Sequence, residues 1–407
     1  MKSALFILVL LIQVFFSIAQ VKPVDDGKSF KSYTYSLNEN RRLAGDHKNY
    51  VEGIRLIKEW LTKYDKVSKE TKDTVKDFHA EMYYNLACYQ NLTGETGEAL
   101  TAFDNCVKSG YSNYYNTIQD TDLKSLHGNK RFENALISIR ERGDMNYILK
   151  TSPPYDNGKV TALPPFIYES PDSKELVDLK VKFNLDSVAG NGDEISKIKR
   201  LLFWAYSIVP HQNGDNPPSR NANDIIEACK RDNRGVNCRM KATILKDAFH
   251  AEGFKSRMIT CMPKDTADTD CHVINVVWSK TLNKWLWMDP TFNAYVSDNK
   301  GELLSVEEVR THLIRNSELL LNKDALKNKE FYLDFYMSKN LYWLRCPVNS
   351  VWDVETYSEN NTVVKYVNLY PGRFNTVNSS RKTSSDTKVF EITNPNYFWQ
   401  KPLDNQF

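Results

Sequence analysis

Apolar residues recur at helical spacing along the first third of the chain. One stripe of four residues, spaced three or four apart, opens this region: Tyr50, Ile54, Ile57 and Leu61. Two more helices are predicted at about 74–92 and 98–109, and the glycine-containing stretch 93–97 between them is typical of a turn. The pattern from 46 to 142 therefore predicts a helical region without long strands.

Seven residues of the predicted helical pair fall at the spacings of the tetratricopeptide pattern: Tyr83, Leu86, Ala87, Gln90, Ala99, Phe103 and Cys106. Small Ala87 and Ala99 would lie where the helices touch, and Phe103 would fill the groove between them. The segment therefore resembles a tetratricopeptide repeat, with 46–64 as a degenerate second one. Because stacked repeats usually need about three units for stability, we expect a packed accessory domain, with peptide contact as the lesser alternative.

The spacing of apolar residues changes in the middle of the chain. Alternating apolar and polar residues at 176–183 predict a half-buried strand, and 193–209 returns to helical spacing. Beyond them the pattern predicts a short helix at 224–230, strands at 273–278, 284–288, 363–369 and 389–392, and a helix at 306–314. Such a mixture is typical of an α+β fold.

The stretch 234–292 carries the residues best suited to chemistry. Asn237 is a good helix cap, an apolar face runs from Met240 to Phe249, and Gly253 would end the helix. Cys238 would then lie in the first helical turn, where unpaired backbone N–H groups and the helix dipole favour a thiolate. The sequence predicts Cys238 as a nucleophile.

The two strands that follow are predicted to bring a histidine and an aspartate together. With residues 279–283 as the loop, His272 at the head of one strand faces Asp289 at the end of the next, directly or nearly so. Opposed residues on paired strands have Cβ atoms about 4.5–5.5 Å apart. The carboxylate could hold one imidazole nitrogen and leave the other for the thiol proton.

A cysteine opening a helix after glycine, a histidine starting a strand, and a tryptophan-rich strand ending in Asp-Pro-Thr resemble the transglutaminase-like superfamily. The resemblance covers about 193–295 and implies a papain-related domain with an antiparallel sheet. It implies Cys238 as nucleophile, His272 as acid and base, and Asp289 as the group that orients the histidine. Candidate supporting or oxyanion-stabilising residues are Trp204, Asn237, Asn275 and Trp287, besides the backbone N–H of Cys238.

The amino-acid composition and net charge argue against some classes of function. Hydrophobic residues make up 41% of the 407, charged residues 26%, and the formal net charge is +3. So small a charge argues against general nucleic-acid binding. No metal or other cofactor is expected; a zinc site of Cys238, Cys261, Cys271 and His272 lacks a usual spacing and would consume the general base.

Seven cysteines leave at least one thiol unpaired. A disulfide between Cys261 and Cys271, or between Cys271 and Cys238, stays open. Sequons begin at Asn91, Asn360 and Asn378.

The start of the chain is typical of a secretory leader. Lys2, an apolar run of about 13 residues and small residues up to Ala19 predict cleavage near Ala19. The run is shorter than the roughly 20 residues that span a bilayer, although an uncleaved anchor is the alternative. We therefore expect a secreted or periplasmic protein without a stable membrane span.

The expected organisation is a signal peptide at 1–19, an N-terminal segment at 20–45, a tetratricopeptide-like domain at 46–145, a linker with first strands at 146–175, a transglutaminase-like catalytic domain at 176–345 and a β-rich extension at 346–407. The expected function is a cysteine enzyme that cleaves or transfers peptide or related amide groups. A non-catalytic peptide- or glycan-binding protein and a peptide deglycosylase are the alternatives. Substrate, acceptor and oligomeric state stay open.

Overall fold

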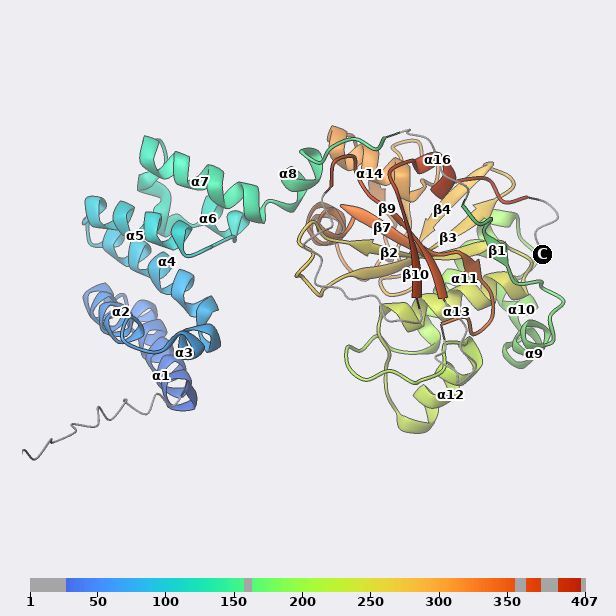
Figure 1. The fold of residues 1–407 in the computed structure, drawn as a ribbon, viewed down its shortest axis with the longest axis horizontal. Coiled ribbons are helices and arrows are strands. Elements are labelled where there is room, and N and C mark those ends of the chain that lie inside the picture. The colour runs from blue at the N-terminus through green and yellow to red at the C-terminus, as the bar shows by residue number, and fades with distance from the viewer. Residues whose placement is uncertain (1–26, 157–162, 356–363, 375–386, 404–407) are drawn as a thin grey trace, which may run out of the picture. The chain divides into compact units, whose positions relative to one another are not determined.

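A computed structural model describes residues 27–156, 163–355, 364–374 and 387–403. The chain divides into two compact units, one up to Arg140 and one from Glu141, and each is treated by itself (Figure 1). With many helices and a six-stranded sheet, the fold is α+β as predicted. Within the described ranges, no helix is both long and apolar enough to cross a bilayer. The predicted leader lies outside them.

The first unit is helical. Its elements are α1 (Gly27–Asp46), α2 (Tyr50–Tyr64), α3 (Lys69–Thr74), α4 (Lys76–Leu92), α5 (Thr96–Lys108), α6 (Tyr114–Gln119), the 3-10 helix η1 (Thr121–Leu126) and α7 (Lys130–Gly143), within which the division falls. Helix α1 was not predicted: Leu37 on it joins the buried core, so the helical region begins before residue 46.

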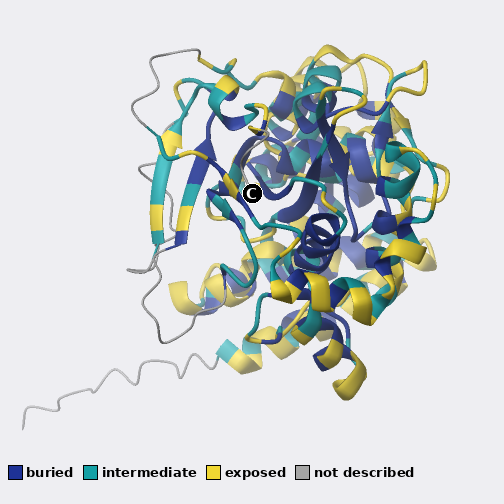
Figure 2. Cartoon of the chain, turned by 90° about the vertical axis from the view of Figure 1, so that its right-hand side faces the viewer, coloured by how far each residue is buried: buried dark blue, intermediate teal, exposed yellow. Residues whose placement is uncertain are grey.

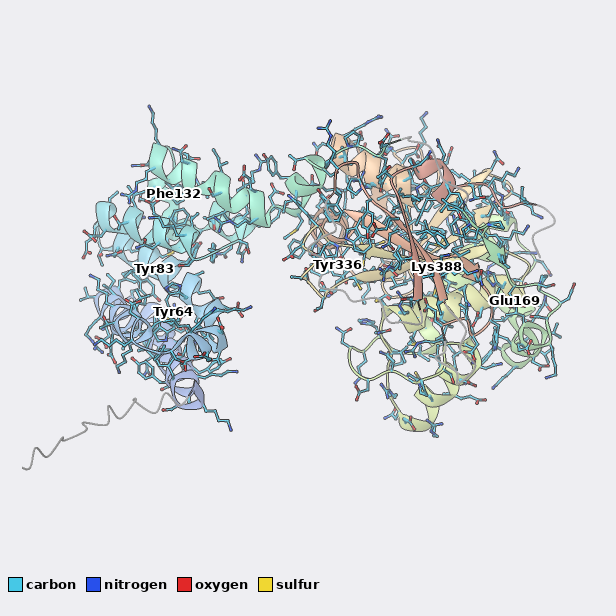
Figure 3. All side chains as sticks on the ribbon, viewed as in Figure 1. Tyr64, Tyr83, Phe132, Glu169, Tyr336 and Lys388 are labelled. Carbon is cyan, nitrogen blue, oxygen red and sulfur yellow. The ribbon has the colours of Figure 1, made fainter. Side chains whose placement is uncertain are left out.

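Helices α4 and α5 pack against each other across the predicted turn, where Gly94 has a positive φ of 83°. Ala87, Ala99 and Phe103 are all fully buried, as their spacing predicts. The Phe103 ring lies 4.6 Å from that of Phe132, which Figure 3 labels. Assignment of the helices to the tetratricopeptide class stays a prediction.

The second unit contains both helices and strands. Its helices are α8 (Met145–Lys150), α9 (Lys174–Phe183), α10 (Leu185–Ala189), α11 (Glu194–Ile208), α12 (Ala222–Asp232), α13 (Cys238–Ala251), α14 (Val306–Arg315), the π-helix η2 (Glu330–Met337), α15 (Ser338–Asn340) and α16 (Pro395–Phe398). The strands are β1 (Ile167–Tyr168), β2 (Ser256–Met262), β3 (His272–Ser279), β4 (Lys284–Met288), β5 (Val296–Ser297), β6 (Leu320–Leu321), β7 (Trp343–Pro347), β8 (Asn349–Ser350), β9 (Val364–Leu369) and β10 (Thr387–Ile392).

Six of these strands form the main sheet, in the order β10-β9-β7-β2-β3-β4. Neighbouring strands are antiparallel except β9 and β10, which are parallel. Side chains alternate across the sheet, so that Ile274 and Val276 join the core with α14, η2 and α16, while Val277 joins the core with α9 to α13. Figure 1 shows α11 and α13 on one side of the strands, and the central strands are dark blue in Figure 2 because both faces are covered.

The stretch 176–183 is a helix, not the predicted strand. Leu176 and Leu179 are fully buried on α9, whereas Val177 and Val181 are exposed. The apolar residues of 176–183 fit a period of two. They also fit a helical stripe, because the residues three and seven positions after Leu176 lie on the same face of a helix. Asn184 in the left-handed conformation ends the helix.

The predicted domain limits within this unit also change. Leu149 on α8 belongs to the core that contains β3 and β4, so this part of 146–175 is not a linker. Strands β9 and β10 belong to the main sheet, so 346–407 is not a separate extension. Both strands lie where the sequence predicted them. Most of the polar segment between them, 375–386, lies outside the described residues.

Candidate active site

Cys238 is the first residue of α13, as predicted. The side chain of Asn237 caps the helix by accepting a hydrogen bond from the N–H of Met240 at 3.1 Å. The rest of the helix is held by the sheet and the other helices, because nearly all its side chains are buried. Cys238 itself is intermediate in exposure, and its thiol is fixed at a helix N-terminus.

The thiol of Cys238 lies next to the imidazole of His272, the first residue of β3, which is the main group that lowers its pKa. Burial raises the pKa of Cys238, but the hydrogen bond and positive charge of His272, the N–H of Val273 and the charge of Arg239 outweigh burial and lower it below its ordinary value. A lowered thiol pKa increases the thiolate fraction at neutral pH.

His272 lies between the thiol and a carboxylate. Its Nε2 atom donates to Oδ2 of Asp289 at 2.7 Å, which leaves Nδ1 for Cys238. Burial lowers the pKa of His272, but the charge and hydrogen bond of Asp289, with those of Cys238, raise it to about 10. The geometry therefore favours a thiolate–imidazolium pair.

The contact between His272 and Asp289 is diagonal rather than directly opposed. Asn275 faces Met288 in the register of β3 and β4, so Asp289 lies across from Ile274, two residues along the face from His272. The cause is a shorter loop than predicted: Ser279 pairs with Lys284, and its hydroxyl donates to Glu194 at 2.7 Å. Diagonal neighbours remain within reach of long side chains.

Asp289 is fully buried and accepts several hydrogen bonds. Oδ1 accepts from the backbone N–H groups of Thr291 at 2.8 Å and Phe292 at 3.3 Å. Oδ2 accepts from His272 and also from the hydroxyl of Tyr332 at 2.7 Å. Tyr332 in turn accepts from Nε1 of Trp287 at 3.1 Å. A buried carboxylate with this many donors is held in one orientation.

Tyr332 was missed in the sequence, and so were two aromatic rings beside the histidine. The ring of Phe292 lies 5.4 Å from that of His272, and the ring of Tyr336 lies 5.2 Å from it in an edge-on arrangement. The density of aromatics after Phe331 was the available signal. That signal could not indicate which of the rings face the histidine, because η2 is a π-helix and does not have the usual helical spacing.

The four supporting candidates have different positions. Asn237 caps α13, and Trp287 reaches Asp289 through Tyr332. Trp204 instead packs among the helices, with its ring 5.6 Å from Phe183. The Nδ2 atom of Asn275 donates to the carbonyl of Ala242 within α13 at 2.9 Å. The structure therefore does not bring Trp204 or Asn275 to the thiol.

A loop segment runs beside the nucleophile instead. Residues 210–212 pair in parallel with Val236, through N–H groups of Val236 and Gln212. A Cβ on Gly235 would lie 2.7 Å from the carbonyl oxygen of Pro210, so glycine permits this approach. This pairing brings His211 near Cys238 and His272. The pKa of His211 is lowered, first by burial and then by the positive charge of His272.

Two basic residues of α13 anchor its start. Lys241 is buried and donates to the carbonyls of Tyr206 at 2.8 Å and Val209 at 2.6 Å, at the end of α11; burial lowers its pKa to about 8. The Nη1 atom of Arg239 donates to both carboxylate oxygens of Glu355, at 2.8 and 2.9 Å.

All seven cysteines are free thiols. Cys261 is buried opposite His272 in the β2–β3 register, and it is not bridged to Cys271. Among the described residues, the one grouping able to hold a metal is Cys88, Asp120 and Asp122 in the first unit. There Asp120 already accepts from Tyr84 and from the N–H of Asp122, and so caps η1.

Comparisons with known proteins add little. No protein-family model and no curated protein matches the chain. Among solved structures, the chain is similar to a candidate cysteine protease from Cytophaga hutchinsonii, at 16% identity and a TM-score of 0.24. The match covers 36% of this chain and about half (49%) of that one.

Proposed function

We propose that the protein is a cysteine enzyme of transglutaminase-like type that acts on amide bonds through Cys238, His272 and Asp289. The observation that carries the proposal is the arrangement of a cysteine at a helix N-terminus, a His272 close enough to lower the pKa of its thiol, and a buried aspartate hydrogen-bonded to that histidine at 2.7 Å. A buried structural cysteine has no need of a paired histidine that is held by a carboxylate.

In the first half of the reaction, the thiolate of Cys238 attacks the carbonyl carbon of an amide. The new S–C bond forms as the carbonyl π electrons move to oxygen, where the N–H of Cys238 is placed to donate because the first residue of a helix has no acceptor within it. The C–N bond then breaks, and the imidazolium of His272 gives its proton to the departing nitrogen.

In the second half, neutral His272 takes a proton from water or from an amine, which attacks the thioester. The S–C bond breaks, the thiolate returns, and His272 is again protonated. Asp289 keeps its negative charge and holds the imidazole in the orientation that both transfers need. Hydrolysis of a peptide or related amide is our first choice, with acyl transfer to an amine sharing every step but the last.

We further propose that the chain is secreted after removal of residues 1–19 and that the helical unit is an accessory domain of tetratricopeptide type. These two proposals rest on the sequence patterns alone. A substrate of protein or peptide class follows from the same resemblance.

The test is the pH dependence of iodoacetamide alkylation at Cys238, read by mass spectrometry. We expect the apparent pKa to lie well below the usual value of about 8.5 in the wild type, and the reactivity at low pH to disappear in His272→Ala. His312→Ala is the matched control, because His312 lies on α14 and bonds only a backbone carbonyl among the described contacts. Cys271 serves as an internal reference in every sample.

Other results would change the assignment. A Cys238 that titrates like a free cysteine in both proteins would remove the enzyme proposal and favour a binding protein. If the thiolate is present, incubation with peptides and a primary amine separates the outcomes by mass: a free carboxylate shows hydrolysis, and an added amine shows acyl transfer.

A further inference from the structure

Helix η2 connects the candidate triad to the protein surface. It is an eight-residue π-helix, Glu330–Met337, whereas π-helices usually occur as single turns and are frequent at functional sites. Its inner residue Tyr332 holds Asp289, and Tyr336 lies edge-on to His272. The sheet side of η2 therefore belongs to the triad, and its other side needs a separate explanation.

The outer side of η2 exposes a row of aromatic rings. Phe331 is 41% and Phe335 37% exposed. The Phe331 ring is stacked parallel to that of Tyr336 at 6.0 Å, and the Phe335 ring follows at 6.1 Å. Rings therefore continue from His272 to Tyr336, Phe331 and Phe335. Clustered exposed apolar side chains of this kind usually mark a binding surface.

The charges at the border of this row are largely compensated. Lys329 pairs with Asp334 at 3.2 Å. Lys339 pairs with Asp268 at 2.9 Å and with Asp270 at 2.6 Å. Lys327 lies over the Phe331 ring, with its Nζ atom 5.5 Å from the ring centre. Because the other charged groups have partners and this cation already covers part of the row, the surface favours a neutral, apolar ligand group over a cationic one.

We propose that Tyr336, Phe331 and Phe335 form a subsite for an apolar, preferably aromatic, side chain of a polypeptide substrate. The proposal rests on the proposed function, since the side chain would belong to a residue next to the amide that Cys238 attacks. A polypeptide advances by about 3.3–3.6 Å per residue, so Tyr336, whose ring lies 5.2 Å from that of His272, lies within one or two residues of the attacked carbonyl. The bound side chain would extend from there toward Phe331 and Phe335. Aromatic side chains match such a surface by edge-on or offset stacking.

The experiment compares two electrophiles that differ in one side chain, acetyl-phenylalanyl and acetyl-glycyl chloromethyl ketone. The alkylation rate of Cys238 by each is divided by the iodoacetamide rate of the same protein, so that changes in the thiolate cancel. We expect the wild type to prefer the phenylalanyl probe by at least about tenfold, as apolar subsites do. Phe335→Ser should lower that preference severalfold, and Phe331→Ser with Phe335→Ser should bring it close to one.

The control is Val177→Ser with Val181→Ser on α9, which removes exposed apolar side chains elsewhere in the unit (44% and 76% exposed). It should keep the full preference. Equal rates for the two probes in a wild type that iodoacetamide labels rapidly would overturn the subsite and leave the proposed function standing. Protection of Cys238 by N-acetylglucosamine oligomers without a phenylalanyl preference would assign the rings to a glycan and also overturn it. Slow labelling by iodoacetamide would instead remove the proposed function.

Discussion

Replacement of Tyr332 by Phe removes one hydroxyl from beneath the triad and keeps the ring. That hydroxyl donates to Asp289 at 2.7 Å and accepts from Trp287 at 3.1 Å, in a fully buried position. A hydrogen bond to a charged group contributes about 1.5–3 kcal/mol, and a buried donor left without a partner costs about 1–3 kcal/mol. Because neighbouring effects do not add fully, we expect the second unit to lose about 2–4 kcal/mol of unfolding free energy.

Urea unfolding followed by tryptophan fluorescence measures this loss. Seven of the eight tryptophans lie beyond residue 140 and only Trp60 lies in the first unit, so the signal reports mainly on the second unit. The midpoint should fall without a change in the slope m. Tyr336→Phe is the matched control: it makes the same change one turn along η2, at a hydroxyl for which the described contacts include no hydrogen bond, and should cost under about 1 kcal/mol. Equal losses in the two variants would refute the supporting role of Tyr332.

Two further predictions concern charge. In Cys238→Ala, stability should fall as pH rises above about 6.5, because Asp289 still raises the pKa of folded His272, which keeps a proton that the unfolded chain has lost; urea midpoints above this pH measure it, and adding His272→Gln should remove the slope. Arg239→Met should cost about 3–5 kcal/mol by leaving buried Glu355 without its charged partner, with only the hydroxyl of Tyr366 among the described contacts still donating to it, and the added change Glu355→Leu should recover most of that loss in the same assay. Recovery of nothing would contradict the ion-pair account.

The start of α13 could be predicted because its signals are local. Asn237 and Gly253 lie at the two ends of one helix, and each acts on backbone groups within a few residues. The same holds for the strand that begins at His272. Its contact with Asp289 was predicted from hairpin symmetry and is present, although the register differs by two residues. Ser279, which closes the hairpin, is hydrogen-bonded to Glu194 from 85 residues away, and no local pattern indicates such a contact.

The supporting groups could not be predicted for a related reason. Trp204 and Asn275 have the right chemistry for an oxyanion site, but which way each side chain points depends on how α11 and β3 pack against α13. His211 has no charged neighbour in the chain that would mark it. It comes near the site because Gly235 lets two distant backbone segments pair. Spacing along a chain does not describe contacts of this kind.

The reactivity expected of Cys238 depends on two opposed effects on its thiol pKa, and residues that do not contact the thiol determine which effect is larger. Burial raises the pKa of its thiol, and the opposing effect of His272, with smaller contributions from the N–H of Val273 and the charge of Arg239, reverses the sign. The neighbouring carboxylate of Asp289 raises the pKa of His272, against burial that would otherwise keep the imidazole neutral. Asp289 in turn owes its position to backbone N–H groups after β4 and to Tyr332. Loss of a hydroxyl 94 residues away in the sequence should therefore weaken the nucleophile without touching it, and a thiol pKa that rises in Tyr332→Phe but not in Tyr336→Phe would show that this series acts as one unit.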